Sequence, residues 1–112
     1  MPPRPYVEYE AINSKVATLT SGTAQSLTDM GFTADELKEA RRLQMTTRTN
    51  QAYALWDGQT PASATNFGIC INQNAFPPLT VEGNKNIKLF KAVGASTGSI
   101  VTVVLEREVT RA

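Results

Sequence analysis

The side chains that could carry out chemistry in this chain are few, and the sequence contains no histidine. Histidine is the commonest general base and metal ligand, and it is the usual partner of a nucleophilic serine or cysteine. Glu36 and Glu39 have a spacing that places both on one face of a helix. That pattern more often marks a solvated charged face than a pair of catalytic carboxylates. We therefore predict that the protein is not an enzyme.

Two other short patterns have simpler structural explanations. The glycine-rich segment from Gly94 to Ser99 lacks the lysine that a phosphate-binding loop requires, and we interpret it as a turn. Cys70 lies between two isoleucines, which favours a small buried hydrophobic residue over a reactive thiolate. A single cysteine cannot form an intramolecular disulfide, and the sequence shows no metal-ligand spacing. We expect neither a cofactor nor a metal site.

Length and composition favour one folded domain. The chain has 112 residues, of which 41% are hydrophobic, and this suits a single core. Its formal net charge of +1 is far from the positive field of a nucleic-acid-binding protein. The longest apolar run, from Ile100 to Leu105, is much shorter than the roughly 20 residues that span a bilayer, and no signal segment opens the chain. We expect no nucleic-acid or membrane partner. We also expect the protein to be made and used without secretion.

Three lysines, Lys85, Lys88 and Lys91, lie among apolar residues in and beside an expected strand from Asn86 to Val93. A basic strand with aromatic neighbours could hold single-stranded nucleic acid. Lysines also protect an exposed edge strand against aggregation, and we favour this second interpretation.

One helix is clearly indicated. Thr33 and Glu36 form a capping box, and Phe32 and Leu37 occupy the two positions of a hydrophobic staple. Acidic residues in the first turn and basic residues in the last turn match the helix dipole. We predict a short helix from Ala34 to Arg42.

Most of the remaining chain has the short apolar runs and turn signals typical of β-strands. The expected strands fall within residues 16–27, 43–47, 52–56, 68–71, 79–82, 86–93 and 99–109. The last two are interpreted as a closing hairpin. In the final strand one face carries Val101, Val103, Leu105 and Val109, while the other carries Thr102, Glu106 and Glu108. We predict a mainly β domain, a small β-sandwich or jelly-roll-like barrel with one short inserted helix.

The first residues carry three prolines and two tyrosines, namely Pro2, Pro3, Pro5, Tyr6 and Tyr9. Proline removes backbone donors and favours extended conformations. The tyrosines give the segment more apolar surface than a solvated tail needs. We predict an extended N-terminal arm over residues 1–15 that docks on a neighbouring molecule, followed by the β domain over residues 16–112. A disordered terminus is the alternative.

A polar loop is a second candidate contact region. It begins at Gln59, contains Pro61 and leads to Phe67. Trp56 and Tyr53 precede it, and together with Phe67 they could form a stacking platform for a sugar. A carbohydrate-binding module is therefore an alternative function, although such aromatic residues more often fill the core.

Four segments follow one another in a characteristic order: Ser26-Leu27-Thr28, the run from Ala52 to Pro61, the Gly68-Ile69 step, and the run from Asn86 to Val93. A Gly/Ser turn and a terminal valine-rich strand follow. This order resembles small β-sandwich structural proteins of tailed-bacteriophage virions. The resemblance covers roughly residues 16–106, and the expected helix is an insertion relative to that layout.

The resemblance implies a capsid decoration or cement protein that binds the major capsid protein and stabilises the shell. Such a protein is made in the host cytoplasm and ends on the capsid surface of the virion. It also implies a homo-oligomer, for which a trimer would suit local threefold sites on a shell. A head-to-tail connector or a tail-associated structural protein is the alternative within the same resemblance.

Overall fold

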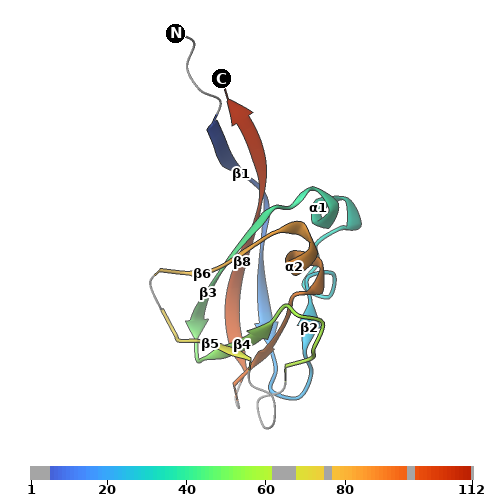
Figure 1. The fold of residues 1–112 in the computed structure, drawn as a ribbon. Helices are drawn as coiled ribbons and strands as arrows, with labels where there is room; N and C mark the ends of the chain where they lie inside the picture. The colour runs from blue at the N-terminus through green and yellow to red at the C-terminus, as the bar shows by residue number, and fades with distance from the viewer. Residues whose placement is uncertain (1–5, 62–67, 75–76, 96–97, 112) are drawn as a thin grey trace.

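The computed structural model describes residues 6–61, 68–74, 77–95 and 98–111, which form two antiparallel four-stranded sheets and two short helices (Figure 1). Buried side chains of both sheets meet in one core cluster. This architecture is the mainly β sandwich that the sequence predicts. It contains two helices, whereas the sequence indicated one.

The first sheet, sheet A, has the strand order β1-β8-β3-β6. Its strands are β1 (Tyr6–Leu19), β8 (Ser99–Arg111), β3 (Arg42–Thr49) and β6 (Leu79–Glu82). Strand β8 lies inside the sheet, paired on both sides, and not at its edge. Val101, Val103 and Leu105 are fully buried, which confirms the expected inner face for these three residues, whereas Val109 is only half-buried.

The second sheet, sheet B, has the order β2-β7-β4-β5. Its strands are β2 (Gln25–Ser26), β7 (Lys91–Gly94), β4 (Ala52–Leu55) and β5 (Ile69–Ile71). The expected hairpin between the last two strands is wrong, because β7 belongs to sheet B and β8 to sheet A. Strand β7 instead pairs with β4 and β2, so the chain crosses from one sheet to the other between β7 and β8.

Helix α1 (Ala34–Glu39) begins at the predicted capping box. The Glu36 amide donates to the Thr33 hydroxyl at 3.2 Å, and the Thr33 amide donates to the Glu36 carboxylate at 2.8 Å. The helix ends three residues earlier than expected. Its C-cap, Ala40, already has extended backbone angles, and Arg42 is the first residue of β3.

Helix α2 (Asn84–Leu89) replaces part of an expected strand, so that prediction is wrong. The Asn84 side-chain amide donates to Leu37 O and Ala40 O, both at 2.8 Å, and so ties α2 to the C-terminal end of α1. Lys85 and Lys88 are exposed on this helix. Edge-strand protection therefore does not explain them, and Lys91 belongs to β7, an inner strand of sheet B.

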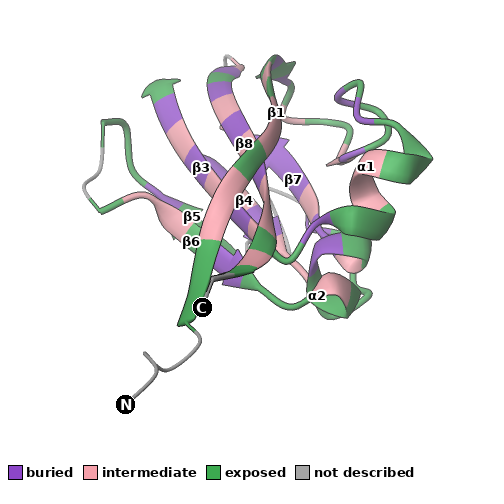
Figure 2. Ribbon diagram, turned by 90° about the horizontal axis from the view of Figure 1, so that it is seen from above, coloured by how far each residue is buried: buried purple, intermediate pink, exposed green. Residues whose placement is uncertain are grey.

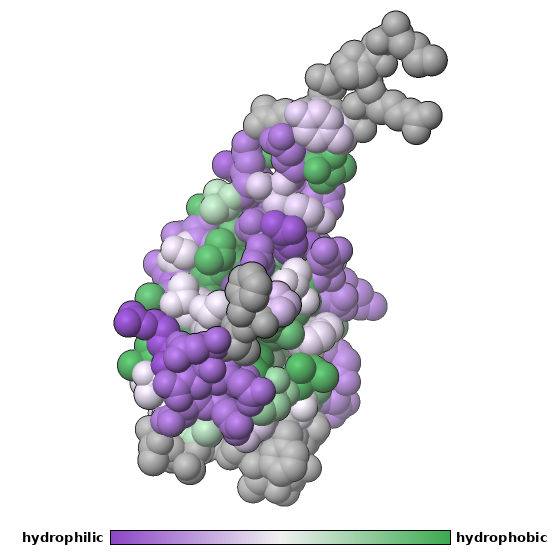
Figure 3. Space-filling model, turned by 90° about the vertical axis from the view of Figure 1, so that its left-hand side faces the viewer, coloured by the Kyte–Doolittle hydropathy of each residue, from purple (hydrophilic) through white to green (hydrophobic). Residues whose placement is uncertain are grey.

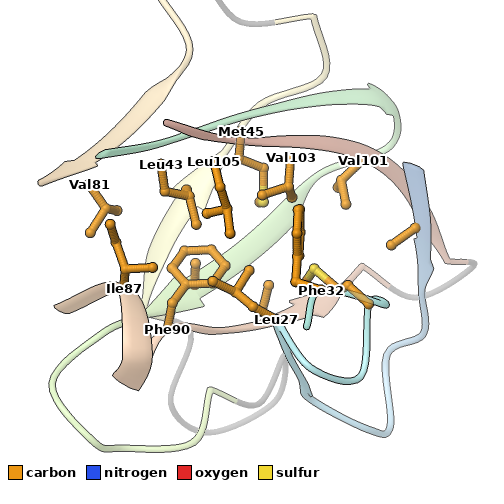
Figure 4. Packing of buried hydrophobic residues seen from close by; sticks show 14 of the residues in the cluster. Leu27, Phe32, Leu43, Met45, Val81, Ile87, Phe90, Val101, Val103 and Leu105 are labelled. Atoms are coloured by element: carbon orange, nitrogen blue, oxygen red, sulfur yellow. The ribbon is translucent and has the colours of Figure 1, made fainter. Parts of the chain in front are cut away.

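The core lies between the sheets and is closed at one side by residues of α2 and of the segment before α1 (Figure 4). Its largest fully buried side chains include Phe90, Leu19, Leu27, Leu43, Met45, Ile87 and Leu105. Trp56 packs against this cluster and stacks on Phe90, with ring centroids 6.4 Å apart and planes 12° apart. The ring of Phe90 thus joins the end of α2 to the end of β4.

Cys70 is exposed, so the expectation that it is a buried hydrophobic residue is wrong. It lies on β5, the edge strand of sheet B, where side chains alternate between the two faces. Ile71 takes the inner face and is buried. Cys70 therefore faces outward.

Candidate binding surface

Strands β1 and β8 continue past the end of the sandwich as a two-stranded ribbon (Figure 1). Glu106 pairs with Ala11 of β1 on one side and with Arg42 of β3 on the other. Beyond Glu106, β1 is the only described strand that pairs with β8. We call Tyr6–Ala11 together with Glu106–Arg111 the ribbon. It lies at the opposite end of the molecule in Figure 1 from strands β4 and β5.

The ribbon includes part of the segment that the sequence assigned to an N-terminal arm. Residues 6–15 are extended, and β8 pairs with them, so the boundary drawn between residues 15 and 16 falls inside β1. Pro2, Pro3 and Pro5 lie outside the described residues. Two candidate contact residues, Tyr6 and Tyr9, lie in the ribbon.

The ribbon presents side chains on both faces. Tyr6 is 53% exposed and Val7, which points to the opposite face, is 52% exposed. Seen from above, the ribbon end is coloured as exposed, and both helices lie together at one side of the sandwich (Figure 2). Figure 3 shows the ribbon rising from the body, with hydrophobic and hydrophilic residues interspersed over that face. The surface is therefore mixed in character, as non-obligate protein interfaces are.

Four side chains form a cluster at the point where the ribbon leaves the sandwich. We call this the root cluster, and its members are Tyr9, Arg42, Gln44 and Glu106. Glu106 accepts two hydrogen bonds from the Arg42 guanidinium, at 2.7 and 3.0 Å, and one from the Gln44 amide at 3.0 Å. The Arg42 guanidinium also lies over the Tyr9 ring, 3.8 Å from its centroid, as a cation–π contact. Bidentate arginine–carboxylate pairs fix orientation. This cluster therefore sets the direction in which the ribbon leaves the sandwich.

The root cluster shifts the titration of its two charged members. The hydrogen bonds from Arg42 lower the pKa of Glu106, since they stabilise its ionised form, and Gln44 adds to this effect. The same hydrogen bonds raise the pKa of Arg42. Both groups are therefore charged across the physiological range.

Two further ion pairs, both formed by Arg107, lie on the opposite face of the ribbon. Arg107 lies 2.7 Å from Glu39 of α1 and 3.7 Å from Glu10 of β1. All three side chains are more than one-third exposed, so water and salt screen the attraction. This contact places α1 beside the ribbon and adds little to the stability of the fold.

We expect the substitution Glu106→Gln to destabilise the protein by about 1–2 kcal/mol at neutral pH, because Arg42 loses its charged partner. The lowered pKa of Glu106 fixes the pH dependence. The stabilisation is present above the ordinary pKa of glutamate and is lost as the pH falls through the lowered value. Urea unfolding of both proteins should therefore show a difference at about pH 7 that shrinks towards about pH 3.

Glu108→Gln is the matched control, since Glu108 is exposed two residues further along the same face of the ribbon. It should change stability by less than about 0.5 kcal/mol. An equal loss from both variants would contradict the role assigned to the root cluster.

The other candidate residues do not join the ribbon. Gln59 is exposed beyond β4, where its backbone N–H donates to the Asp57 carboxylate at 3.0 Å. Pro61 is fully buried, so it does not fit the surface contact that the sequence suggested. Phe67 lies outside the described residues.

The described aromatic residues of the proposed sugar platform do not lie together. Trp56 packs against the core and stacks on Phe90. Tyr53 lies between two buried alanines of β4 and therefore faces outward from sheet B. Its hydroxyl hydrogen-bonds the Gln51 side chain at 3.2 Å. This arrangement does not favour carbohydrate stacking.

Sequence reasoning missed Arg42 and Gln44 as partners of Glu106. The polar face of the last strand was predicted, and it did place Glu106 on the outer side. The partner positions carried no local signal, because Arg42 was expected to end a helix.

No protein-family model, curated protein or solved structure matches the chain. Within the described ranges, no group of three or more histidine, cysteine or acidic residues is arranged to hold a metal ion. No helix in this part of the chain is long and apolar enough to cross a membrane.

Proposed function

We propose that this protein is a non-enzymatic structural subunit of a tailed-phage particle, a capsid decoration or cement protein that binds the shell of major capsid protein. The observation that carries the proposal is the ribbon, which extends a β-sheet away from the sandwich and exposes Tyr6 and Val7. The β-sandwich agrees with the fold that the resemblance to such virion proteins implies.

The root cluster supports a binding role for the ribbon. A surface that is ordered before it binds loses less conformational entropy on docking. The hydrogen bonds among Arg42, Gln44 and Glu106, together with β pairing, restrict the ribbon in this way. Repetition of one modest contact over a symmetric shell, by a homo-oligomer, then gives strong overall attachment.

Quantitative mass spectrometry of purified particles tests the proposal. A copy number equal to that of the major capsid protein, or a simple fraction of it, is expected for a cement protein. A ring of about a dozen copies per particle, which the resemblance implies for a connector, would instead favour the connector or tail alternative. Absence of the chain from intact particles would overturn a virion role altogether.

Shell binding by ribbon variants tests the surface. We expect the double variant Tyr6→Ala with Val7→Ala to bind purified shells at least about tenfold more weakly than the wild type, because exposed aromatic and aliphatic anchors dominate interface energies. Co-sedimentation with shells that lack the protein measures this. Ile69→Ala, which trims a side chain that is 50% exposed on sheet B, is the matched control and should bind normally. Equal binding by the double variant and the control would contradict the assignment of the ribbon.

A further inference from the structure

Strand β1 is an edge strand of sheet A. One of its edges pairs with β8, and no described strand pairs with the other. The strand is 14 residues long, and an edge of that length is a template for pairing with another chain. The Thr18 carbonyl points away from β8 towards this free edge, where it accepts a hydrogen bond from the Gln25 side chain at 2.9 Å. By alternation, the backbone groups of Val16 and Ser14 point the same way.

The inner face of β1 is the one on which Ala17 and Leu19 are buried, and the opposite face is the outer one. The outer face carries apolar residues on both sides of a bulge. The register with β8 shifts between Ala11 and Asn13, so Tyr9 and Val16 share the outer face although they are seven residues apart. Val16 is 67% exposed, more than any other large hydrophobic residue in the described ranges. Tyr9 is half-buried under Arg42. Glu10 and Lys15 lie on the inner face by the same count.

We propose that β1 pairs with β1 of a second copy of this chain, antiparallel and about a two-fold axis, so that the two A sheets form one continuous sheet. One register places Tyr9 opposite Val16 of the second copy on the outer face. The same register places Glu10 opposite Lys15 of the second copy on the inner face. The axis repeats both contacts.

Charge along β1 favours a second copy as the partner. The acidic residues Glu8 and Glu10 lie in the first half of the strand, and Lys15 lies in the second half. Antiparallel self-pairing brings each half against its opposite, whereas parallel self-pairing would bring the acidic halves together. Glu10 retains Arg107, and Lys15 retains Glu36, as further charged neighbours in the monomer.

The arrangement places the two ribbons at opposite ends of the dimer, each beside the sandwich of the other copy. The paired edge runs from Tyr9 to Val16, because the Gln25 side chain already occupies the edge at Thr18. The tip of each ribbon, with Tyr6 and Val7, stays outside this paired region. The inference goes beyond the proposed function, since it requires no capsid protein.

Sedimentation velocity of the full chain over a range of concentrations tests the dimer. The wild type should change with concentration from 12.2 kDa to twice that mass. We expect Val16→Lys to raise the dimer dissociation constant at least about tenfold, because it puts a charge on the paired edge. Ile69→Lys, on the exposed edge strand of sheet B, is the matched control and should dimerise as the wild type does.

A charge exchange tests the register. Lys15→Glu and Glu10→Lys should each weaken the dimer, and an equimolar mixture of these two variants should restore it, because each Glu then meets a Lys. Circular dichroism confirms that each variant is folded. Each of four outcomes would overturn the proposal. These are a wild type that stays monomeric, a wild type that forms a trimer, equal effects of Val16→Lys and Ile69→Lys, and a mixture of the two charge variants that stays monomeric. None of these outcomes depends on shell binding, so the proposed function is tested separately.

Discussion

The substitution Gly94→Ala is expected to destabilise the protein by about 3 kcal/mol, at the upper end of the usual cost of overpacking. Gly94 is a buried residue of β7, and its amide donates to Thr20 O at 2.9 Å. A β-carbon at this position would lie 2.5 Å from Leu19 O and 2.9 Å from Leu19 C. These are backbone atoms at the end of β1, which cannot move aside as a flexible side chain can. The absence of a side chain at Gly94 thus lets sheet B approach sheet A.

Gly22→Ala is the matched control, because a β-carbon there would meet no atom within 4 Å. Alanine also restricts the unfolded chain, so this control should leave stability unchanged or raise it by up to about 1 kcal/mol. Urea unfolding followed by circular dichroism compares the two variants with the wild type. Similar stabilities for Gly94→Ala and Gly22→Ala would show that the two sheets do not approach each other so closely.

The start of α1 could be predicted because its determinants are local. Thr33 and Glu36 lie three residues apart and satisfy each other's backbone amides in the structure. Its end could not be predicted in the same way. The Arg41 amide donates to Glu106 O at 2.8 Å, and Arg42 pairs with Glu106, so a strand distant in sequence ends the helix.

Helix α2 gave no comparable signal. Its N-cap is Gly83, which offers no side chain to cap the helix, and Ile87 is its only buried residue. The apolar residues Ile87, Leu89 and Phe90 also fit a strand when they are read with Lys88 between them. In the structure, Ile87 faces the core from the helix and Phe90 faces it from just after the helix.

The ribbon and its root show the same division between local and distant determinants. An extended conformation near Tyr6 and Tyr9 was expected from the prolines and tyrosines around them. The pairing of this segment with β8 was not expected, because no local pattern links β1 to β8. Arg42 and Glu106 are 64 residues apart, so their hydrogen bonds appear only when β3 and β8 are adjacent.

The substitution Phe90→Ala is expected to destabilise the protein by about 3–5 kcal/mol, the usual cost of removing a fully buried aromatic ring. Phe90 follows α2, and its ring fills the space between this helix and Trp56. Its loss leaves a cavity in the core and removes the surface on which Trp56 stacks. Because most domains are stable by only about 5–15 kcal/mol, the variant should be close to unfolding.

Trp56 is the only tryptophan, so its fluorescence reports directly on this site. We expect the emission of folded Phe90→Ala to shift to longer wavelength, because water gains access to the indole ring. Phe90→Leu fills part of the cavity and should lose less stability, which keeps the test informative if the alanine variant does not fold. Tyr6→Ala removes an aromatic ring that is 53% exposed, and should leave both stability and emission nearly unchanged. A Phe90→Ala protein as stable as Tyr6→Ala, with unshifted emission, would mean that Phe90 does not join α2 to β4 in the core.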